Sequence, residues 1–325
     1  MTVTLRDGVR IEAEGVGTVV ADADAPAGTV NVITHAHGDH LFDTPAAPER
    51  VVCSATTAAL AAVRRPAADF EVDDHPRVDL LDAGHIAGSR AVRVEGDERT
   101  VLYTGDCSPR DRCYLDGFDP VPADVLVIEA TYGRPEYVFP DQDELERRIV
   151  DWLDETLERP VLLFGYALGR AQKLQRLVAR SDRSRLLVSE AIADLNAAIE
   201  THLDVAFDAE AYDDLAPEPG DAVVLPMGSA RLEFVDRLVA ERDAVTAGFS
   251  GWAVDDSFLY RGGYDETFVL SDHADFEELC AIVDAVDPDQ VYTQHGFADE
   301  LARELTARGY DARALKRDQT SLGQF

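Results

Sequence analysis

The chain has 325 residues, of which 46% are hydrophobic, so it can bury two cores or one large core carrying an insertion. Its formal net charge is −33, and the acidic residues recur along the whole chain, whereas an acidic partner-binding tail would concentrate them in one block. An evenly acidic surface is typical of a protein adapted to concentrated salt, because salt screens the repulsion among its own carboxylates. We therefore expect a halophilic protein.

Two kinds of targeting segment are not found in the sequence. Residues 1–7 lack the apolar core of a signal peptide, and no run approaches the ~18–20 apolar residues of a membrane span. The four cysteines form no CxxC pair, which favours thiols over a disulfide framework. These features predict a cytoplasmic protein without a membrane partner.

The first predicted strand, residues 30–33, leads into the sequence Thr-His-Ala-His-Gly-Asp-His at 34–40. This segment holds three of the eight histidines of the chain. Neutral imidazoles and carboxylates suit zinc and related divalent ions. A tight turn after a strand can direct alternate side chains of one segment toward one metal ion and the following two side chains toward a second. The segment therefore predicts a metal site.

Further Val/Leu/Ile-rich segments end in polar turns in the same way. They are 78–81 before His85, 101–103 before Asp106, 125–128 before Glu129, 268–270 before His273 and 291–294 before His295. In layered α/β folds, functional sites gather where strands end and loops begin. We therefore expect these polar side chains to share one site.

The middle of the chain has a different pattern, in which apolar strands alternate with helices. The predicted pairs are 161–164 before 171–179, 186–188 before 191–202, and 223–225 before 232–240. This alternation is typical of an open parallel sheet. It predicts a second domain at 140–265, inserted into a first domain formed by 1–139 and 266–325.

Two sets of motifs resemble a known family. His35-x-His37-x-Asp39-His40, the later His85 and Asp106 in Thr-Gly-Asp resemble the ligand set of the metallo-β-lactamase superfamily. Glu129 in Glu-Ala-Thr-Tyr-Gly, His273 in Ser-Asp-His-Ala-Asp and His295 in His-Gly resemble further motifs of its β-CASP nuclease branch. Segments 164–173 and 268–275 are similar to those of the short ligase-associated DNA exonucleases and the related mRNA 3′-end processing exonuclease-like group.

The resemblance implies an α/β fold, an αβ/βα sandwich built from both ends of the chain, with a reduced β-CASP domain of parallel sheet and flanking helices inserted. It also implies two divalent metal ions, zinc or alternatively manganese. The implied ligands are His35, His37 and His85 for one ion, Asp39, His40 and His295 for the other, and Asp106 between them. Two such ions can activate water and stabilise the charge that develops on a phosphodiester.

The resemblance further implies three catalytic residues. Asp39 would orient the attacking water as well as bind metal, and His273 would protonate the leaving oxygen. Glu129 would orient His273 and support its proton affinity. The alternative for this pair is a core histidine whose polar atoms are satisfied by a carboxylate.

A set of substrate-binding residues is predicted with less specific signals. The turn that ends at Gly169, between a strand and a helix, can offer backbone N–H groups to a phosphate, with Arg170 and Lys173 adding charge. Tyr132 can stack on a base or pack in the core. Ser271, in the Ser-Asp-His motif, completes the set.

These features predict a two-metal phosphodiesterase that cleaves single-stranded nucleic acid. The ligase-associated resemblance favours a 5′ DNA exonuclease in DNA repair, with a DNA ligase as a possible partner. The main alternative is an exonuclease or endonuclease of RNA processing or decay, with an RNA-processing partner. A small-substrate metallo-hydrolase is disfavoured by Glu129, His273 and the insertion. A silent scaffold subunit is disfavoured by the complete ligand set.

Overall fold

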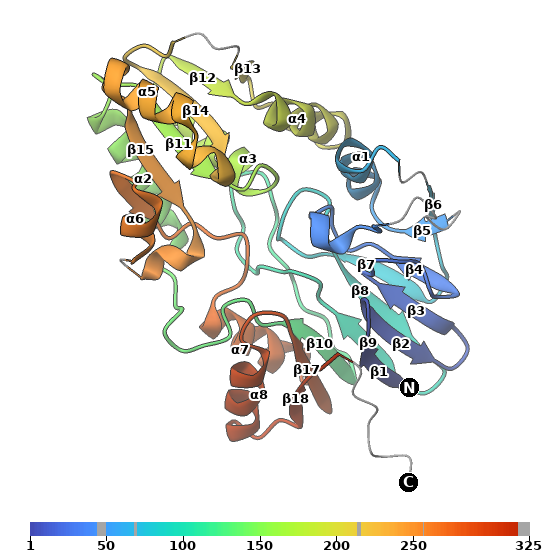
Figure 1. Ribbon diagram of the computed structural model, residues 1–325. Coiled ribbons are helices and arrows are strands. Elements are labelled where there is room, and N and C mark those ends of the chain that lie inside the picture. The colour runs from blue at the N-terminus through green and yellow to red at the C-terminus, as the bar shows by residue number, and fades with distance from the viewer. Residues whose placement is uncertain (44–49, 68–69, 213–215, 256, 318–325) are drawn as a thin grey trace. The chain divides into compact units, whose positions relative to one another are not determined.

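The computed structural model describes residues 1–43, 50–67, 70–212, 216–255 and 257–317. Two compact units make up the chain (Figure 1). The first consists of Met1–Arg110, Asp116–Glu136 and His273–Phe325, and the second of Asp111–Leu115 and Tyr137–Asp272. The segment predicted as an insertion, 140–265, lies within the second unit.

The first unit contains two six-stranded sheets. The first sheet has the order β1-β2-β3-β4-β5-β6, antiparallel from β1 to β3 and parallel from β3 to β6. Its strands are β1 Thr2–Leu5, β2 Val9–Ala13, β3 Gly17–Ala21, β4 Val30–Val32, β5 Arg50–Val52 and β6 Glu71–Asp73. The short 3₁₀ helix η1 (Gly38–His40) and helix α1 (Ala55–Arg64) follow β4 and β5 respectively.

The second sheet has the order β18-β17-β10-β9-β8-β7. Strands β18, β17, β10 and β9 are parallel, and β7, β8 and β9 are antiparallel neighbours. The strands are β7 Val78–Asp82, β8 Arg90–Glu95, β9 Thr100–Tyr103, β10 Val125–Glu129, β17 Gln290–Gln294 and β18 Ala312–Ala314. The carboxyl ends of β9, β10 and β17 therefore meet at one edge.

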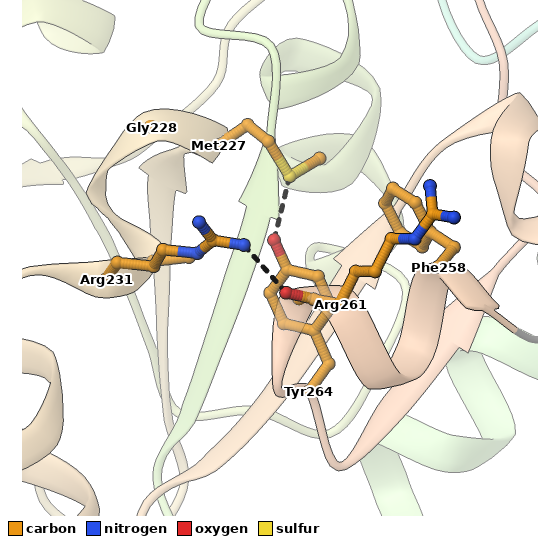
Figure 2. Close-up of a pocket in the computed structure, with 8 residues that line it drawn as sticks. Met227, Gly228, Arg231, Phe258, Arg261 and Tyr264 are labelled. Atoms are coloured by element: carbon orange, nitrogen blue, oxygen red, sulfur yellow. Dashed lines mark hydrogen bonds between the residues drawn. The ribbon is translucent and has the colours of Figure 1, made fainter.

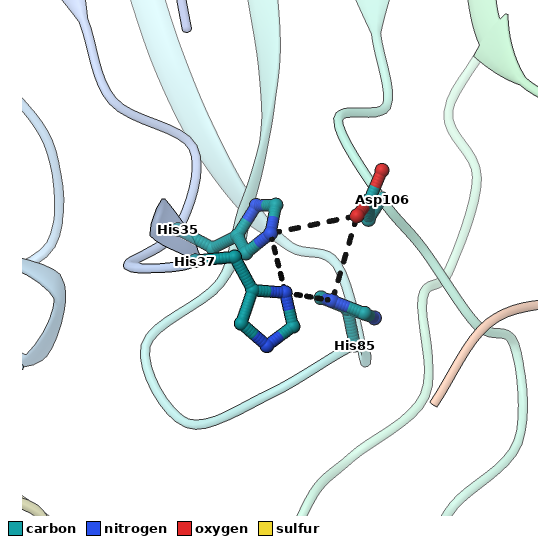
Figure 3. Close-up of side chains that lie close together, drawn as sticks. All are labelled: His35, His37, His85 and Asp106. Carbon is teal, nitrogen blue, oxygen red and sulfur yellow. Dashed lines mark hydrogen bonds and ion pairs between the residues drawn. The ribbon is translucent and has the colours of Figure 1, made fainter. Parts of the chain in front are cut away.

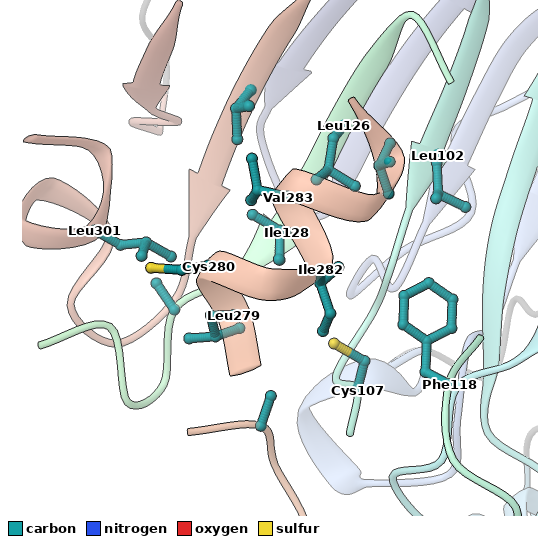
Figure 4. Packing of buried hydrophobic residues seen from close by; sticks show 14 of the residues in the cluster. Leu102, Cys107, Phe118, Leu126, Ile128, Leu279, Cys280, Ile282, Val283 and Leu301 are labelled. Atoms are coloured by element: carbon teal, nitrogen blue, oxygen red, sulfur yellow. The ribbon is translucent and has the colours of Figure 1, made fainter. Parts of the chain in front are cut away.

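Side chains that alternate along β9 and β10 define the layers of the first unit. Tyr103 and Val127 pack in a core shared with the first sheet. Leu102, Leu126 and Ile128 point the other way, against helices α7 (Phe276–Val286) and α8 (Ala298–Ala307) (Figure 4). On this side of the unit the layers follow in the order first sheet, second sheet, helices α7 and α8. These strands are apolar on both faces because both faces are covered.

The second unit is built on one six-stranded sheet of order β13-β12-β14-β11-β15-β16, in which every pairing is parallel. Its strands are β11 Val161–Gly165, β12 Arg185–Val188, β13 Glu210–Ala211, β14 Asp221–Pro226, β15 Val245–Phe249 and β16 Glu266–Phe268. Its helices are α2 Gln142–Glu155, α3 Arg170–Val178, α4 Glu190–His202, α5 Glu233–Arg242 and α6 Ser257–Gly262.

Both faces of this parallel sheet are covered. Leu163 and Val224 face a core with α2, α3 and α4, whereas the neighbouring Phe164 and Leu225 face a core with α5. The open parallel sheet predicted for the middle region is confirmed, and so is the α/β fold class. Within the described residues no helix has both the length and the apolar composition needed to cross a membrane, and the longest, α2, has 14 residues.

The second unit also has a surface hollow of about 390 Å³ beside the 3₁₀ helix η2 (Met227–Arg231) and α6 (Figure 2). Arg231 crosses it and donates from Nη2 to the Arg261 carbonyl oxygen at 2.8 Å. Tyr264 lies in its wall and donates to Met227 Sδ at 2.9 Å. None of the predicted site residues lines this hollow.

Candidate metal centre

The predicted ligands and catalytic carboxylate of the first unit follow the carboxyl ends of strands. Glu129 is the last residue of β10, and His295 follows β17 directly. Glu129 is paired in register with Gln294, the residue before His295. Asp106 lies three residues after β9, the other neighbour of β10. Parallel pairing thus brings three distant segments of the sequence to one edge of the second sheet.

Two glycines explain why these turns have the sequences they do. Gly105, before Asp106, has a φ of +55°, and a Cβ there would come within 2.9 Å of the Thr34 side chain. Gly296, after His295, has a φ of +47°, and its Cβ would come within 2.4 Å of the Ala130 carbonyl oxygen. Positive φ and close approach both favour glycine. Each glycine lets a ligand-bearing turn pack tightly against a neighbouring one.

Four side chains converge on one point (Figure 3). Nε2 of His35 and Nε2 of His85 lie 3.1 and 3.2 Å from Nδ1 of His37. The same two Nε2 atoms lie 3.5 and 3.6 Å from Oδ2 of Asp106. A tetrahedral ion with ligand bonds of about 2.0–2.2 Å spaces its ligand atoms about 3.3–3.6 Å apart. The donor types and spacing therefore fit a divalent ion.

A second set of donors borders the first through Asp106. Nε2 of His40 lies 3.7 Å from Oδ2 of Asp106 and 3.9 Å from Oδ2 of Asp39. The ring centroid of His295 lies 5.7 Å from that of His40. His295 adopts a left-handed backbone conformation with a φ of +57°, which is uncommon for a residue other than glycine. Oδ2 of Asp106 thus faces Nε2 of His40 as well as Nε2 of His35 and His85.

Ionisation in this cluster follows from burial and the neighbouring charges. Burial, with help from the surrounding imidazoles, lowers the pKa of His35 well below its usual value, so this histidine is neutral and can bind metal. Burial alone would also lower the pKa of His40. The carboxylates of Asp22, Asp106 and Asp39 instead raise it to about 10. His40 must therefore lose a proton before it can bind a metal ion.

Asp22, which was not among the predicted site residues, orients two of these histidines. Its Oδ2 lies 2.9 Å from Nδ1 of His40 and accepts hydrogen bonds from the Thr34 hydroxyl at 2.7 Å and from the Tyr103 hydroxyl at 2.8 Å. Thr34 Oγ1 in turn lies 3.0 Å from Nδ1 of His35. Because Asp22 and Thr34 hold the two Nδ1 atoms, Nε2 of both histidines is directed toward Asp106.

Glu129 and His273 form a close pair beside the metal ligands. Nδ1 of His273 lies 2.9 and 3.0 Å from the two carboxylate oxygens of Glu129, which is fully buried. Glu129 also accepts from the Cys107 backbone N–H at 2.7 Å. Burial would raise the pKa of Glu129, but His273 and these hydrogen bonds hold it below its usual value. The ring centroid of His273 lies 4.5 Å from that of His85.

Arg170 and Lys173, which were predicted to contact the substrate, are paired inside the protein. Both side chains are buried, each 1% exposed. Nζ of Lys173 lies 2.6 Å from Oδ1 of Asp272, and Nη2 of Arg170 lies 3.0 Å from Oδ2 of the same carboxylate. A buried cation needs a partner inside the protein, and both find it in Asp272.

The other predicted substrate-binding residues are also buried. The backbone N–H of Gly169, expected to face a phosphate, donates to the side chain of Gln172 at 2.7 Å. Tyr132 is 2% exposed, with its ring centroid 6.1 Å from that of His273, which fits the packing alternative better than base stacking. Ser271 is 4% exposed. A substrate contact by Gly169, Tyr132 or Ser271 remains a prediction.

Sequence reasoning missed the roles of Asp22 and Asp272, which are two of many acidic residues in the chain. Asp22 directly follows strand β3, which was not predicted from the sequence, and its partners Tyr103 and His40 are distant in the chain. Asp272 lies within the Ser-Asp-His motif, and its position next to His273 was the one available hint. Long-range partners of this kind are visible only in the folded chain.

Comparisons with known proteins show which sequences this chain is similar to. No protein-family model matches the chain. It is 35% identical over 305 residues to a probable DNA ligase of Opitutus terrae, a match that covers 90% of this chain and 29% of the relative. It is 33% identical over 118 residues to an RNase J-like protein of Methanocaldococcus jannaschii, covering 35% of this chain and 28% of the relative. It is 36% identical over 96 residues to the ribonuclease TTHA0252 of Thermus thermophilus, a match that covers 28% of this chain and 22% of the relative.

The fold is also similar to that of a solved structure. A crystal structure of a protein of unknown function from Enterococcus faecalis matches with a TM-score of 0.66 at 15% identity, covering 98% of this chain and 97% of that one. The chain spans less than a third of the length of the curated relatives above. The solved structure shows a shared α/β fold. The sequence relatives confirm the resemblance to the β-CASP nucleases of the metallo-β-lactamase superfamily that the motifs predicted.

Proposed function

We propose that the protein is a two-metal phosphodiesterase that cleaves single-stranded nucleic acid. The observation that carries this proposal is the shared carboxylate of Asp106, whose Oδ2 lies 3.5–3.7 Å from Nε2 of His35, His85 and His40. A small-substrate hydrolase does not need the additional Glu129–His273 pair beside such a centre. A phosphodiester, with a poor leaving group, benefits from an acid at that position.

The two donor sets would each hold one divalent ion. His35, His37 and His85 would hold the first, Asp39, His40 and His295 the second, and Asp106 both. Imidazole and carboxylate donors suit zinc, with manganese as the alternative. Ions bound here would act as Lewis acids toward a phosphoryl group and would make water a better nucleophile.

The residues of the chain supply the proton transfers and the orientation. Glu129 engages Nδ1 of His273, so the proton delivered to the leaving oxygen would be carried by Nε2. The carboxylate of Glu129 stabilises the protonated ring. Asp39, whose side chain is 77% exposed, is accessible to solvent and would orient the attacking water.

DNA is the favoured substrate, and the proposed activity is that of a 5′ exonuclease in DNA repair. The match to the probable DNA ligase supports this choice because it extends over 90% of the chain. A DNA ligase is accordingly the proposed partner, and the second unit is the proposed inserted β-CASP domain. RNA processing is the second candidate, since matched relatives are named as ribonucleases. The even acidity of the chain supports action in a salt-rich cytoplasm.

One experiment tests the substrate and the polarity of cleavage together. Matched single-stranded DNA and RNA, labelled at either end and carrying a 5′ phosphate or a 5′ hydroxyl, are incubated with the protein in molar KCl. We expect stepwise shortening of DNA from the 5′ end. Faster cleavage of RNA would favour the second candidate, and cleavage of neither strand would refute the proposal.

The variant His273→Ala completes this test. It should lose about 10²–10⁴-fold in activity, the usual worth of a general acid, while its metal content is unchanged. A nitrophenyl phosphodiester, whose leaving group needs no protonation, should be cleaved at close to the wild-type rate. Loss of a metal ion, or full activity on ordinary strands, would refute the assignment.

A further inference from the structure

Four buried charged residues of the second unit form a cluster, which we call the Asp272 cluster: Arg112, Arg170, Lys173 and Asp272. Each is 1–3% exposed. Lys173 and Arg170 engage the two carboxylate oxygens of Asp272 at 2.6 and 3.0 Å. Arg112 donates from Nη2 to the backbone carbonyl of Asp272 at 3.2 Å and from Nη1 to that of Ser271. Both the side chain and the backbone of Asp272 are therefore fixed.

Holding one residue with buried charged groups is unfavourable in desolvation free energy, because each of these groups is moved away from water. The pKa of Lys173 is lowered to about 8 by burial and by repulsion from Arg112, against the opposing effect of Asp272. Apolar residues of similar volume would be expected to stabilise the fold at least as well. What the ionic cluster adds is a defined geometry at Ser271 and Asp272.

The residue that follows Asp272 is the proposed general acid. Asp272 ends the second unit, and His273 begins the returning segment of the first. On the far side of His273, the Ala274 N–H donates to the Cys107 carbonyl at 2.7 Å. The His273 ring is held by Glu129. The peptide that carries the imidazole is thus anchored on both sides in the sequence.

We propose that the Asp272 cluster is a positioning device that sets the direction of the His273 imidazole, so that Nε2 meets the leaving oxygen. The inference rests on the proposed acid role of His273. The four residues act through His273 and touch no reacting atom. Because proton transfer requires a heavy-atom distance of about 2.6–3.2 Å, a small shift of this peptide weakens protonation of the leaving group. It does not alter metal binding.

The test compares two substrates in matched variants. Lys173→Met removes the ion pair with Asp272, and Arg112→Met removes the hydrogen bonds to the Ser271 and Asp272 carbonyls. Each variant also removes one buried cation, so folding should survive in at least one of them. Arg183→Met is the control, because Arg183 is another buried cation of the second unit, 9% exposed, that donates to backbone carbonyls. The full-length, metal-loaded protein is used throughout, with melting temperature and metal content measured for each variant.

We expect Lys173→Met and Arg112→Met to lower kcat/KM on an ordinary single strand by about 10–100-fold, the usual cost of a misplaced catalytic group. On a nitrophenyl phosphodiester they should remain within about threefold of wild type, like His273→Ala, because no acid is needed. Equal losses on both substrates, or full activity on both, would overturn the positioning role. If His273→Ala itself does not distinguish the substrates, the acid role and the positioning role both fail. If His273→Ala loses activity only on the ordinary strand but Lys173→Met and Arg112→Met do not distinguish the two substrates, only the positioning role fails.

Discussion

Replacing Asp22 with asparagine should weaken metal binding, although Asp22 is not a predicted ligand. Asp22 Oδ1 accepts from the Thr34 N–H at 2.8 Å, and Oδ2 faces three groups at 2.7–2.9 Å, including Nδ1 of His40. In Asp22→Asn the amide oxygen can keep the Thr34 N–H bond. The amide nitrogen then takes the position of Oδ2, where it donates and cannot accept.

The consequence for His40 can be worked out from its two ring nitrogens. Nδ1 of His40 would have to accept a hydrogen bond, which moves the ring proton to Nε2, the atom that lies 3.7 Å from Asp106. A protonated nitrogen cannot bind a metal ion. His35 is affected less, because the Thr34 hydroxyl can rotate and still accept from it. Loss of such an outer partner typically weakens metal binding about 10–100-fold, which corresponds to about 1.4–2.7 kcal/mol.

The assay is equilibrium dialysis against buffered Zn²⁺, with metal content measured at each free concentration. The second ion, bound by His40, should show the larger loss of affinity. Asp124→Asn is the matched control, since Asp124 also accepts from a threonine N–H and hydroxyl, those of Thr100, at 2.6 and 2.9 Å. Wild-type affinity for both ions in Asp22→Asn, or an equal loss in Asp124→Asn, would refute the reasoning.

Four further outcomes are expected. His295→Ala should lower occupancy of the second ion and spare the first, as measured by metal content; one ion per active wild-type chain would contradict this. Because the pKa of His40 is raised to about 10, binding of the second ion must displace a proton, so its affinity should rise up to about tenfold per pH unit from pH 6 to 9, and a flat titration would count against it. The pKa of Lys173 is lowered from 10.5 to about 8, so the unfolded chain binds this proton more tightly. The unfolding free energy of wild type relative to Lys173→Met should therefore increase as the pH rises from 8 to 10.5, and urea titrations showing a decrease would disagree. Finally, the melting temperature should increase from dilute buffer to molar KCl, and a protein most stable in dilute buffer would rule out the halophilic interpretation.

The sequence alone predicted those features of the fold and of the candidate site that depend on a short segment of the chain. The alternation of apolar strands with helices in 161–240 predicted a parallel sheet, because both faces of such a sheet are buried and each crossover requires a helix. The cluster from His35 to His40 was recognisable because its donors lie within six positions of one another. Strand ends followed by Asp106, Glu129 and His295 could be assigned to one site because parallel strands place their carboxyl ends at the same edge.

Only the folded chain decided which charged groups are partners. Lys173 and Arg170 were expected to face a phosphate, since a cation beside a glycine turn is chemically suited to that role. In the structure they pair with Asp272, about a hundred residues further along the chain. Likewise, Asp22 is one acidic residue among many until the fold brings Thr34, Tyr103 and His40 to its carboxylate. Residue types and local spacing determine what a side chain can bind, whereas burial and long-range packing determine which of its possible partners it meets.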